Sequence, residues 1–156
     1  MSSLRSLIEQ NMKEAMKTKD VLRLSVLRIL LSVAHNKLID KKYKEGSAEL
    51  SDEEFLNVIR SEVKKRKDSV REFRRGGREE MANKEEEEIK VLTAYLPAEL
   101  TDNELEKTVE DVIKELGHLT PKDFGKAMSH VMKRVAGRAG GDRVKEILNK
   151  TISSGK

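Results

Sequence analysis

The stretch VLRLSVLRILLSVAHNKL, residues 21–38, decides the fold class of this chain. Its apolar residues recur every three or four positions, which is the spacing of one face of an α helix. The expected buried stripe consists of Val21, Leu24, Leu27, Leu31, Ala34 and Leu38. No segment of the sequence shows the strict alternation of apolar and polar residues that is typical of a β strand. We therefore expect an all-α protein.

Helix start signals divide the rest of the chain into further helices. Ser51 and Thr101 are each followed three residues later by a glutamate, Glu54 or Glu104. In such a capping box the hydroxyl accepts an amide proton of the first turn, and the glutamate reaches back to the cap residue. Pro121 also favours a helix start. Proline lacks a backbone N–H, but in the first turn of a helix that group would have no partner within the helix. The predicted helices cover residues 3–17, 20–39, 51–75, 78–95, 101–116, a segment that begins at 120–121, and a last one that contains residues 144–152.

Two breaks organise these helices. Gly76 and Gly77 turn the chain between the third and fourth helices. Pro97 ends the fourth, because its ring disfavours helical geometry at the preceding residue. A loop is expected from Tyr43 to Ala48. The boundary at Pro97 divides the chain into a four-helix N-terminal unit, residues 1–97, and a three-helix tail domain, residues 98–156.

Composition narrows the functional classes. Charged residues make up 38% of the chain and aromatic residues 3%, so a sheet that stacks bases on exposed rings is not expected. The absence of cysteine excludes disulfides, thiolate metal ligands and a cysteine nucleophile. No run approaches the roughly 20 apolar residues of a membrane span. The N-terminal segment carries Glu9, Glu14 and Asp20, which argue against a targeting peptide. We expect a cytoplasmic protein with no membrane partner.

The run Lys64–Lys67, on the third predicted helix, is the densest cluster of positive charge. Such a cluster binds nucleic acid by releasing the counterions that are condensed on the phosphates. An alternative is that the third and fourth helices form an antiparallel hairpin, in which Glu85–Glu88 lies opposite the run and neutralises it. Arg74, Arg75 and Arg78 lie near the tip of this hairpin, where we expect less neutralisation.

A second group of basic residues lies in the tail, where the sign of the charge changes along the sequence. Residues 98–117 contain seven acidic and two basic side chains, whereas residues 121–156 contain nine basic and three acidic ones. We expect the cations of the latter stretch to be unpaired by the protein's own carboxylates and able to bind a polyanion. The predicted nucleic-acid-binding residues combine this group with the hairpin tip: Lys126, Lys133, Arg134, Arg138, Arg143, Lys145, Arg74, Arg75 and Arg78.

The turn Gly137–Gly141 lies within the tail group. A glycine-rich turn before a helix presents unpaired amide protons and the positive end of the helix dipole, and both favour an anion. The same sequence is also typical of an ordinary helix end followed by a flexible turn. Asp142, at the start of the next helix, would repel a phosphate and favours this second interpretation.

No residue pattern indicates a catalytic or metal site. His35, His118 and His130 are far apart in the sequence and lack the spacing of metal-binding motifs, so we expect structural or surface roles for them. The carboxylates lie on solvated helix faces, and no pair is distinguished as acid and base. There is no phosphate-binding glycine loop and no dinucleotide fingerprint. We expect no catalytic residue, no metal and no cofactor.

Taken together, the sequence resembles the YqeY family along nearly its whole length. The resemblance rests on the order and spacing of short motifs and not on any single one. These motifs are Met16-Lys17, Asp20, Arg23–Arg28, Lys64-Lys65-Arg66, Phe73, Gly76-Gly77-Arg78, Tyr95-Leu96-Pro97, Asp123-Phe124-Gly125-Lys126, Met128, Met132 and Gly137-Arg138. One departure is that family members commonly have an Asp-Gly pair shortly after the Gly-Arg, whereas this chain has Gly140-Gly141-Asp142.

The resemblance implies a four-helix part and a small three-helix tail, like the C-terminal region of the GatB component of the tRNA-dependent amidotransferase. That region is associated with holding tRNA, while amide transfer occurs in other domains. With the charge distribution, this favours a non-catalytic tRNA-binding accessory module of aminoacyl-tRNA metabolism and translation. One alternative is a protein-interaction module that docks to an aminoacyl-tRNA synthetase or an amidotransferase. The other is the activity of the family label, a carbon–nitrogen ligase with glutamine as amido-N-donor.

Overall fold

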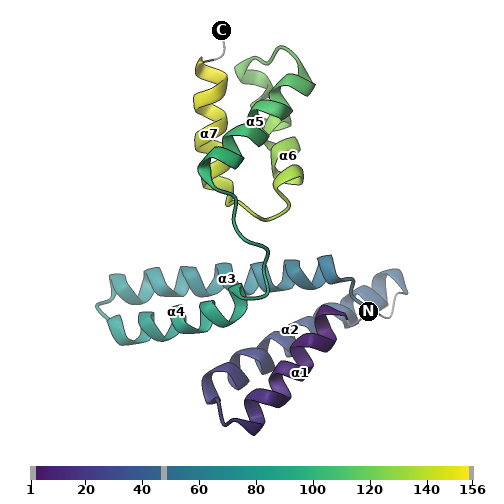
Figure 1. Ribbon diagram of the computed structural model, residues 1–156, viewed down its shortest axis with the longest axis vertical. Coiled ribbons are helices and arrows are strands. Elements are labelled where there is room, and N and C mark those ends of the chain that lie inside the picture. Colours follow the sequence, from purple (N-terminus) through teal and green to yellow (C-terminus); the bar gives the residue numbers. More distant parts are fainter. Residues whose placement is uncertain (1–2, 47–48, 155–156) are drawn as a thin grey trace. The chain divides into compact units, whose positions relative to one another are not determined.

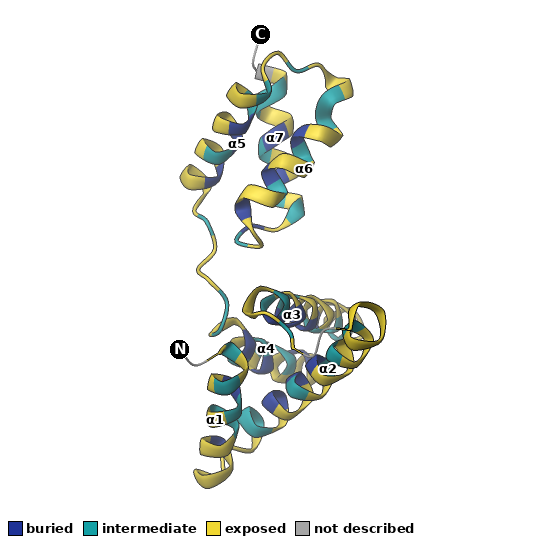
Figure 2. Cartoon of the chain, turned by 90° about the vertical axis from the view of Figure 1, so that its right-hand side faces the viewer, coloured by how far each residue is buried: buried dark blue, intermediate teal, exposed yellow. Residues whose placement is uncertain are grey.

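The structure, a computed structural model, describes residues 3–46 and 49–154. It consists of two compact units, Met1–Leu96 and Pro97–Lys156 (Figure 1). Every regular element in the described residues is a helix and none is a strand, so the predicted all-α fold class is confirmed. Figure 2 shows that the buried positions of each unit face that unit's own interior, so each unit has its own core.

The first unit is built from four helices. They are α1 (Leu4–Lys17), α2 (Val21–Glu45), α3 (Asp52–Arg75) and α4 (Glu79–Thr93). The predicted capping box of α3 is confirmed: the Ser51 hydroxyl accepts from the Glu54 amide at 3.2 Å, and the Glu54 carboxylate accepts from the Ser51 amide at 2.7 Å. The largest fully buried side chains of this core are Ile8, Leu27, Leu30, Phe55, Ile59 and Leu92.

Helix α2 departs from its predicted course at both ends. Val21 is 75% exposed, so its assignment to the buried stripe is wrong. It is the first residue of the helix, and the stripe reaches the core only in the following turns. The predicted loop is wrong for Tyr43–Glu45, which are helical, because nothing ends the helix before Gly46 adopts a left-handed conformation with φ of +70°. Residues 47–48 of that loop lie outside the described residues.

The α3–α4 hairpin forms as predicted, and the two helices lie side by side (Figure 1). Its turn depends on Gly77, which has a φ of +73° in a region that side-chain-bearing residues rarely adopt. The amide of Arg78 donates to the carbonyl of Phe73 at 2.8 Å and closes the end of α3.

The second unit contains three α helices and one short 3-10 turn. They are α5 (Asp102–Leu116), η1 (Pro121–Asp123), α6 (Phe124–Val135) and α7 (Gly141–Ser154). The second capping box is confirmed, since the Thr101 hydroxyl accepts from the Glu104 amide at 3.2 Å and the Glu104 carboxylate accepts from the Thr101 amide at 2.8 Å. The helix expected from Pro121 begins as the 3-10 turn, and α6 starts at Phe124. The core side chains include Leu105, Val109, Val112, Val131, Val144 and Leu148.

Truncating the core of the first unit should destabilise it strongly. Phe55 is 2% exposed, so Phe55→Ala removes buried apolar contacts and leaves a cavity. We expect a loss of about 3–5 kcal/mol in the free energy of unfolding, measured by urea denaturation. The control is Tyr43→Ala, at a side chain that is 92% exposed, which should change that free energy by less than about 0.5 kcal/mol. Equal losses in the two variants would contradict the placement of this core.

Candidate nucleic-acid interface

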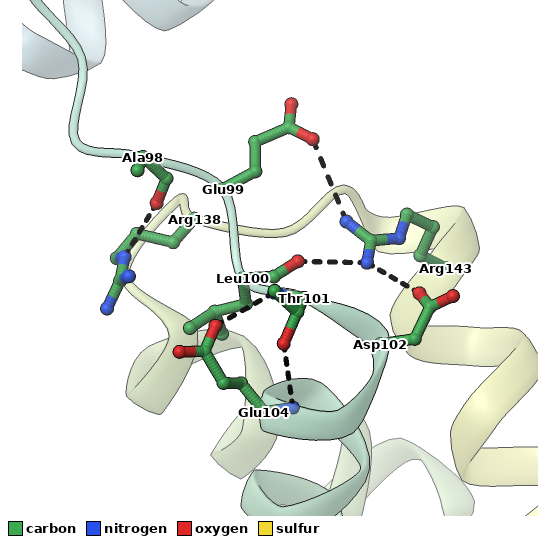
Figure 3. Close-up of polar contacts among 8 residues, drawn as sticks. All are labelled: Ala98, Glu99, Leu100, Thr101, Asp102, Glu104, Arg138 and Arg143. Carbon is green, nitrogen blue, oxygen red and sulfur yellow. Dashed lines mark hydrogen bonds and ion pairs between the residues drawn. The ribbon is translucent and has the colours of Figure 1, made fainter.

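Arg138 lies in the turn between α6 and α7 and contacts the segment that leads into α5. Its Nε donates to the carbonyl oxygen of Ala98 at 2.8 Å (Figure 3). Its own carbonyl oxygen accepts from the amide of Leu100 at 2.8 Å. The side chain is half-buried. Arg138 therefore helps to hold the segment before α5 against this turn.

Arg143 holds the same segment from the first turn of α7. Its Nη2 donates to the Leu100 carbonyl at 3.0 Å and to the Asp102 carboxylate at 2.8 Å (Figure 3). Its Nη1 lies 3.7 Å from the Glu99 carboxylate. A planar guanidinium suits several acceptors at once, because its donors form a rigid fork. The positive charge of Arg143 is therefore shared with two carboxylates of its own unit.

The carboxylate of Glu104 completes this group of contacts. Its pKa is lowered chiefly because the Thr101 backbone amide donates to it, with further contributions from the Thr101 side chain and from the positive charge of Arg138. The glutamate thus remains charged at the N-terminus of α5, where the helix dipole favours a negative group.

Arg134, near the end of α6, forms a two-pronged ion pair with Glu115 of α5. Its Nη1 and Nη2 donate to the two carboxylate oxygens at 2.9 and 2.7 Å. This contact lowers the pKa of Glu115, because the hydrogen bonds from Arg134 stabilise the charged carboxylate. The pKa of Arg134 is raised for the same reason. Both side chains are about half exposed, at 45% and 58%, so solvent weakens the pair.

The expectation that the tail cations are unpaired is therefore wrong for Arg134 and Arg143. The acidic helix α5 packs beside α6 and α7, so charges that are segregated in the sequence become paired in space. That these arginines and Arg138 bind nucleic acid stays a prediction. Their guanidinium groups already have partners within the unit.

Two predicted lysines on α6 do remain without an ion pair. Lys126 and Lys133 are exposed, and neither pairs with any residue in the described part of the chain. Together with the exposed His130 they occupy positions i, i+4 and i+7 of one helix, which share one face. We call these three residues the α6 lysine face. Lys126 to Lys133 spans about 10 Å along the axis.

Two carboxylates interact electrostatically with residues of this face, Asp123 with Lys126 and Glu115 with His130. The pKa of the Asp123 carboxyl is lowered first by a hydrogen bond from the Thr120 amide and in small part by the charge of Lys126. Lys145 is also exposed on α7 and has no ion pair within residues 3–46 and 49–154. His130 was not among the predicted binding residues, although its spacing from Lys126 and Lys133 was a usable signal.

The basic run of the first unit is partly neutralised, as the hairpin alternative predicts. Arg66 contacts Glu85 at 3.3 Å and also pairs with Glu88, and all three side chains are largely buried. Lys64 and Lys67 are exposed and make no ion pair with another described residue. The predicted pairing across the hairpin is confirmed for Arg66.

The hairpin tip is more neutralised than expected. Arg74 lies 3.2 Å from Glu79 and 2.9 Å from Glu86, and these carboxylates, Glu86 first, raise its pKa. The expectation of weak neutralisation is wrong for Arg74, because Glu79, at the start of α4, and Glu86, further along it, both lie within its reach. Arg75 contacts Glu72 at 3.2 Å in a mostly exposed pair. The third predicted tip residue, Arg78, has no ion pair among the residues that the structure describes.

The histidines and carboxylates do not gather into a metal site. Within residues 3–46 and 49–154, no group of three or more His, Asp or Glu side chains could hold a metal ion. In that part of the chain no helix has the length and apolar character needed to cross a membrane. The three histidines are exposed and lie in α2, in the segment before η1 and in α6.

Comparisons with known proteins identify one matching family and several related proteins. A family model described as Yqey-like protein matches residues 5–152. Curated relatives include three yeast proteins, each named altered inheritance of mitochondria protein 41, mitochondrial. The protein of Vanderwaltozyma polyspora is 30% identical over 74% of this chain and 64% of its own length. Those of Kluyveromyces lactis and Candida glabrata are 38% and 37% identical, over 58% and 57% of this chain and 47% of each relative. The chain thus spans less than two thirds of the length of these relatives.

The Arg134–Glu115 contact predicts a measurable titration. Because Arg134 stabilises the charged carboxylate, Arg134→Gln should raise the pKa of Glu115 toward its ordinary value. The measurement is a carbon-13 NMR titration of the Glu115 side chain. Arg143→Gln is the control and should leave this pKa unchanged, since Arg143 contacts other carboxylates. An unchanged Glu115 pKa in Arg134→Gln would show that the pair does not form in solution.

Proposed function

The chain belongs to the YqeY family, and we propose that it is a non-catalytic tRNA-binding accessory module that contacts phosphates through the α6 lysine face. The observation that carries this proposal is that Lys126 and Lys133 share one exposed helix face without ion pairs to described residues. A cation that has no internal partner can release a counterion from a polyanion without breaking a contact of its own protein.

The distribution of charge in the second unit supports the same face. Helix α5 carries a surplus of acidic residues, and its Glu115 neutralises Arg134 at one edge of α6. An acidic side and a basic side in one small unit orient a polyanion as it approaches. Lysine ammonium groups also act as point charges on flexible stems, which suits phosphate contacts that do not read bases.

The proposed function also has a pathway and a cellular compartment. We place the protein in aminoacyl-tRNA metabolism and translation, with a tRNA-dependent amidotransferase as the related system. The cytoplasmic location stays a prediction, since the names of the yeast relatives place those proteins in mitochondria. The proposal itself requires only a compartment that contains tRNA. If the isolated chain formed an amide product from glutamine, the carbon–nitrogen ligase alternative would replace the proposed tRNA-binding function.

Reversing the two lysines should weaken tRNA binding. We expect Lys126→Glu with Lys133→Glu to lower the affinity for tRNA and to reduce the slope of log Kd against log salt concentration by about 2, because two phosphate contacts are lost. The matched control is Lys107→Glu with Lys114→Glu on α5, which makes the same change in net charge on exposed lysines. Equal weakening in both variants, or none in the first, would contradict the proposal. Fluorescence anisotropy over a salt series provides the measurement.

A second candidate, a protein-interaction module, is favoured by an unusual face of α2. Its exposed positions recur every three or four residues and include large apolar side chains: Val21, Ile29, Ile39 and Tyr43, with exposures of 75%, 45%, 52% and 92%. Ser25, Ser32 and Asn36 lie between them. We call these seven residues the α2 outer face. In a chain with 38% charged residues, a face of about 33 Å without a charge marks a surface for a partner.

The charges around this face identify the kind of partner. Arg28 and Lys42 are exposed beside it and have no ion pair with any described residue, and the exposed Asp40 borders its other side. Because two of these three charges are positive, the face fits a partner helix, on an aminoacyl-tRNA synthetase or an amidotransferase, whose apolar stripe is bordered mainly by carboxylates.

A designed peptide tests this second candidate. A helical peptide with a leucine stripe flanked by glutamates should bind and perturb the NMR signals of α2, and Ile39→Asp with Tyr43→Asp should remove this binding. The control peptide carries lysines in place of the glutamates and should not bind. Binding of both peptides, or binding that survives the two substitutions, would contradict the assigned partner chemistry. Perturbation of the same signals by tRNA would instead assign the face to nucleic acid.

A further inference from the structure

A groove is lined by residues of α2 and α3. Figure 1 shows these two helices running apart from each other along their length. The groove encloses about 300 Å³, a volume at the lower end of the range for small-molecule sites. Val33 and Val58 form an apolar part of its lining, and the remaining lining residues are polar or charged. Glu62 is the one buried residue among these polar and charged side chains, and the others are exposed or partly exposed.

Glu62 is the most informative residue of this groove. It is 7% exposed, and the only other buried charged residue among the described ones is Glu88. Glu88 pairs with Arg66, whose side chain is only 12% exposed. Glu62 has a weaker partner, because Lys65 contacts it at 3.2 Å from a side chain that is 69% exposed. A nearly buried carboxylate is costly unless it is well compensated, so Glu62 is suited to bind a second cationic group.

The opposite wall carries the complementary charge. Lys37 lines the groove from α2 and makes no ion pair with a residue that the structure describes. Asn57 and Ser61 line the α3 wall and offer neutral hydrogen-bonding groups. At the far end, Glu54 is already bound by Lys41 and by the Ser51 amide, and these contacts lower its pKa to about 2. Glu54 is therefore committed to the structure, whereas Glu62 contacts only the exposed Lys65 and can bind a further cationic group.

Asp40 is the one other acidic residue of the lining, and it shares α2 with Lys37. It is exposed, so water compensates its charge well, unlike that of Glu62. The groove thus combines a shielded negative group, an unpaired positive group on the facing helix and a short apolar surface. A ligand that matches these features carries an ammonium group, a carboxylate and a small side chain.

We propose that this groove binds a free α-amino acid. The ammonium group contacts Glu62, the carboxylate contacts Lys37, and the side chain lies over Val33 and Val58. The site belongs to the first unit, so it is independent of the tRNA contacts proposed for α6. It gives the protein a small-molecule ligand in addition to its macromolecular partner.

The test is an NMR titration of the full chain, without tRNA, with leucine, serine and lysine at up to about 10 mM, since an open groove of this size should bind with a Kd on the order of 1 mM. We expect signals of residues 33–40 and 57–65 to shift with at least one of them. Acetate and methylamine, which carry only one of the two charges, should produce no saturable shift. No shift with any of the three amino acids, or the same shift with acetate or methylamine, would overturn the proposal.

Two variants assign the contacts. Glu62→Gln keeps the shape of the side chain and should weaken binding at least 10-fold. Lys37→Gln, at an exposed position that does not support the core, should weaken binding of leucine but not of leucine methyl ester, which lacks the carboxylate. Unchanged leucine binding in both variants, with spectra that show an intact fold, would contradict the site. Equal binding of leucine and its methyl ester by the unmodified chain would contradict the role of Lys37.

Discussion

Ion pairs between neighbouring helices are the constraint on which both the charged surface and the proposed function of this protein depend. Arg66 is held between carboxylates in the α3–α4 hairpin, and Arg134 forks onto Glu115 between α6 and α5. Breaking the largely buried Arg66 pair would cost several kcal/mol, whereas an exposed pair such as Arg134–Glu115 contributes less than about 1 kcal/mol. The exposed pairs matter for function, because they decide which positive charges stay available to a partner.

In the second unit, arginines form the internal contacts and lysines provide the charges that stay available to a partner. Within this unit, Arg134 contacts a carboxylate, Arg138 contacts a backbone carbonyl, and Arg143 contacts both kinds of group. Lys126 and Lys133 have no such partner among the described residues. The rigid fork of arginine fits several fixed acceptors, while the lysine ammonium group keeps its hydration and mobility. The sequence therefore overstates the basic surface of the folded unit, because its arginines contact their own unit and its lysines remain available to a partner.

The local parts of this structure could be predicted from sequence, and the non-local parts could not. The capping boxes at Ser51 and Thr101 depend on residues three apart, and the pairing of Arg66 with Glu85 and Glu88 follows from one tight turn. The Arg143–Asp102 contact joins residues 41 apart and depends on how α7 packs beside α5, which no periodicity reveals. The groove between α2 and α3 was missed because its lining comes from two helices that each look merely amphipathic.

The central claim, that the available lysines of α6 and not the paired arginines meet tRNA, is tested most directly by lysine footprinting. An amine-reactive label is applied to the protein with and without tRNA, and modification is read by mass spectrometry. We expect Lys126 and Lys133 to be labelled in the protein alone and protected by tRNA, while Lys107 and Lys114 on α5 are labelled equally in both samples. Protection of the α5 lysines, or unchanged labelling of Lys126 and Lys133 in a sample that binds tRNA, would contradict the account.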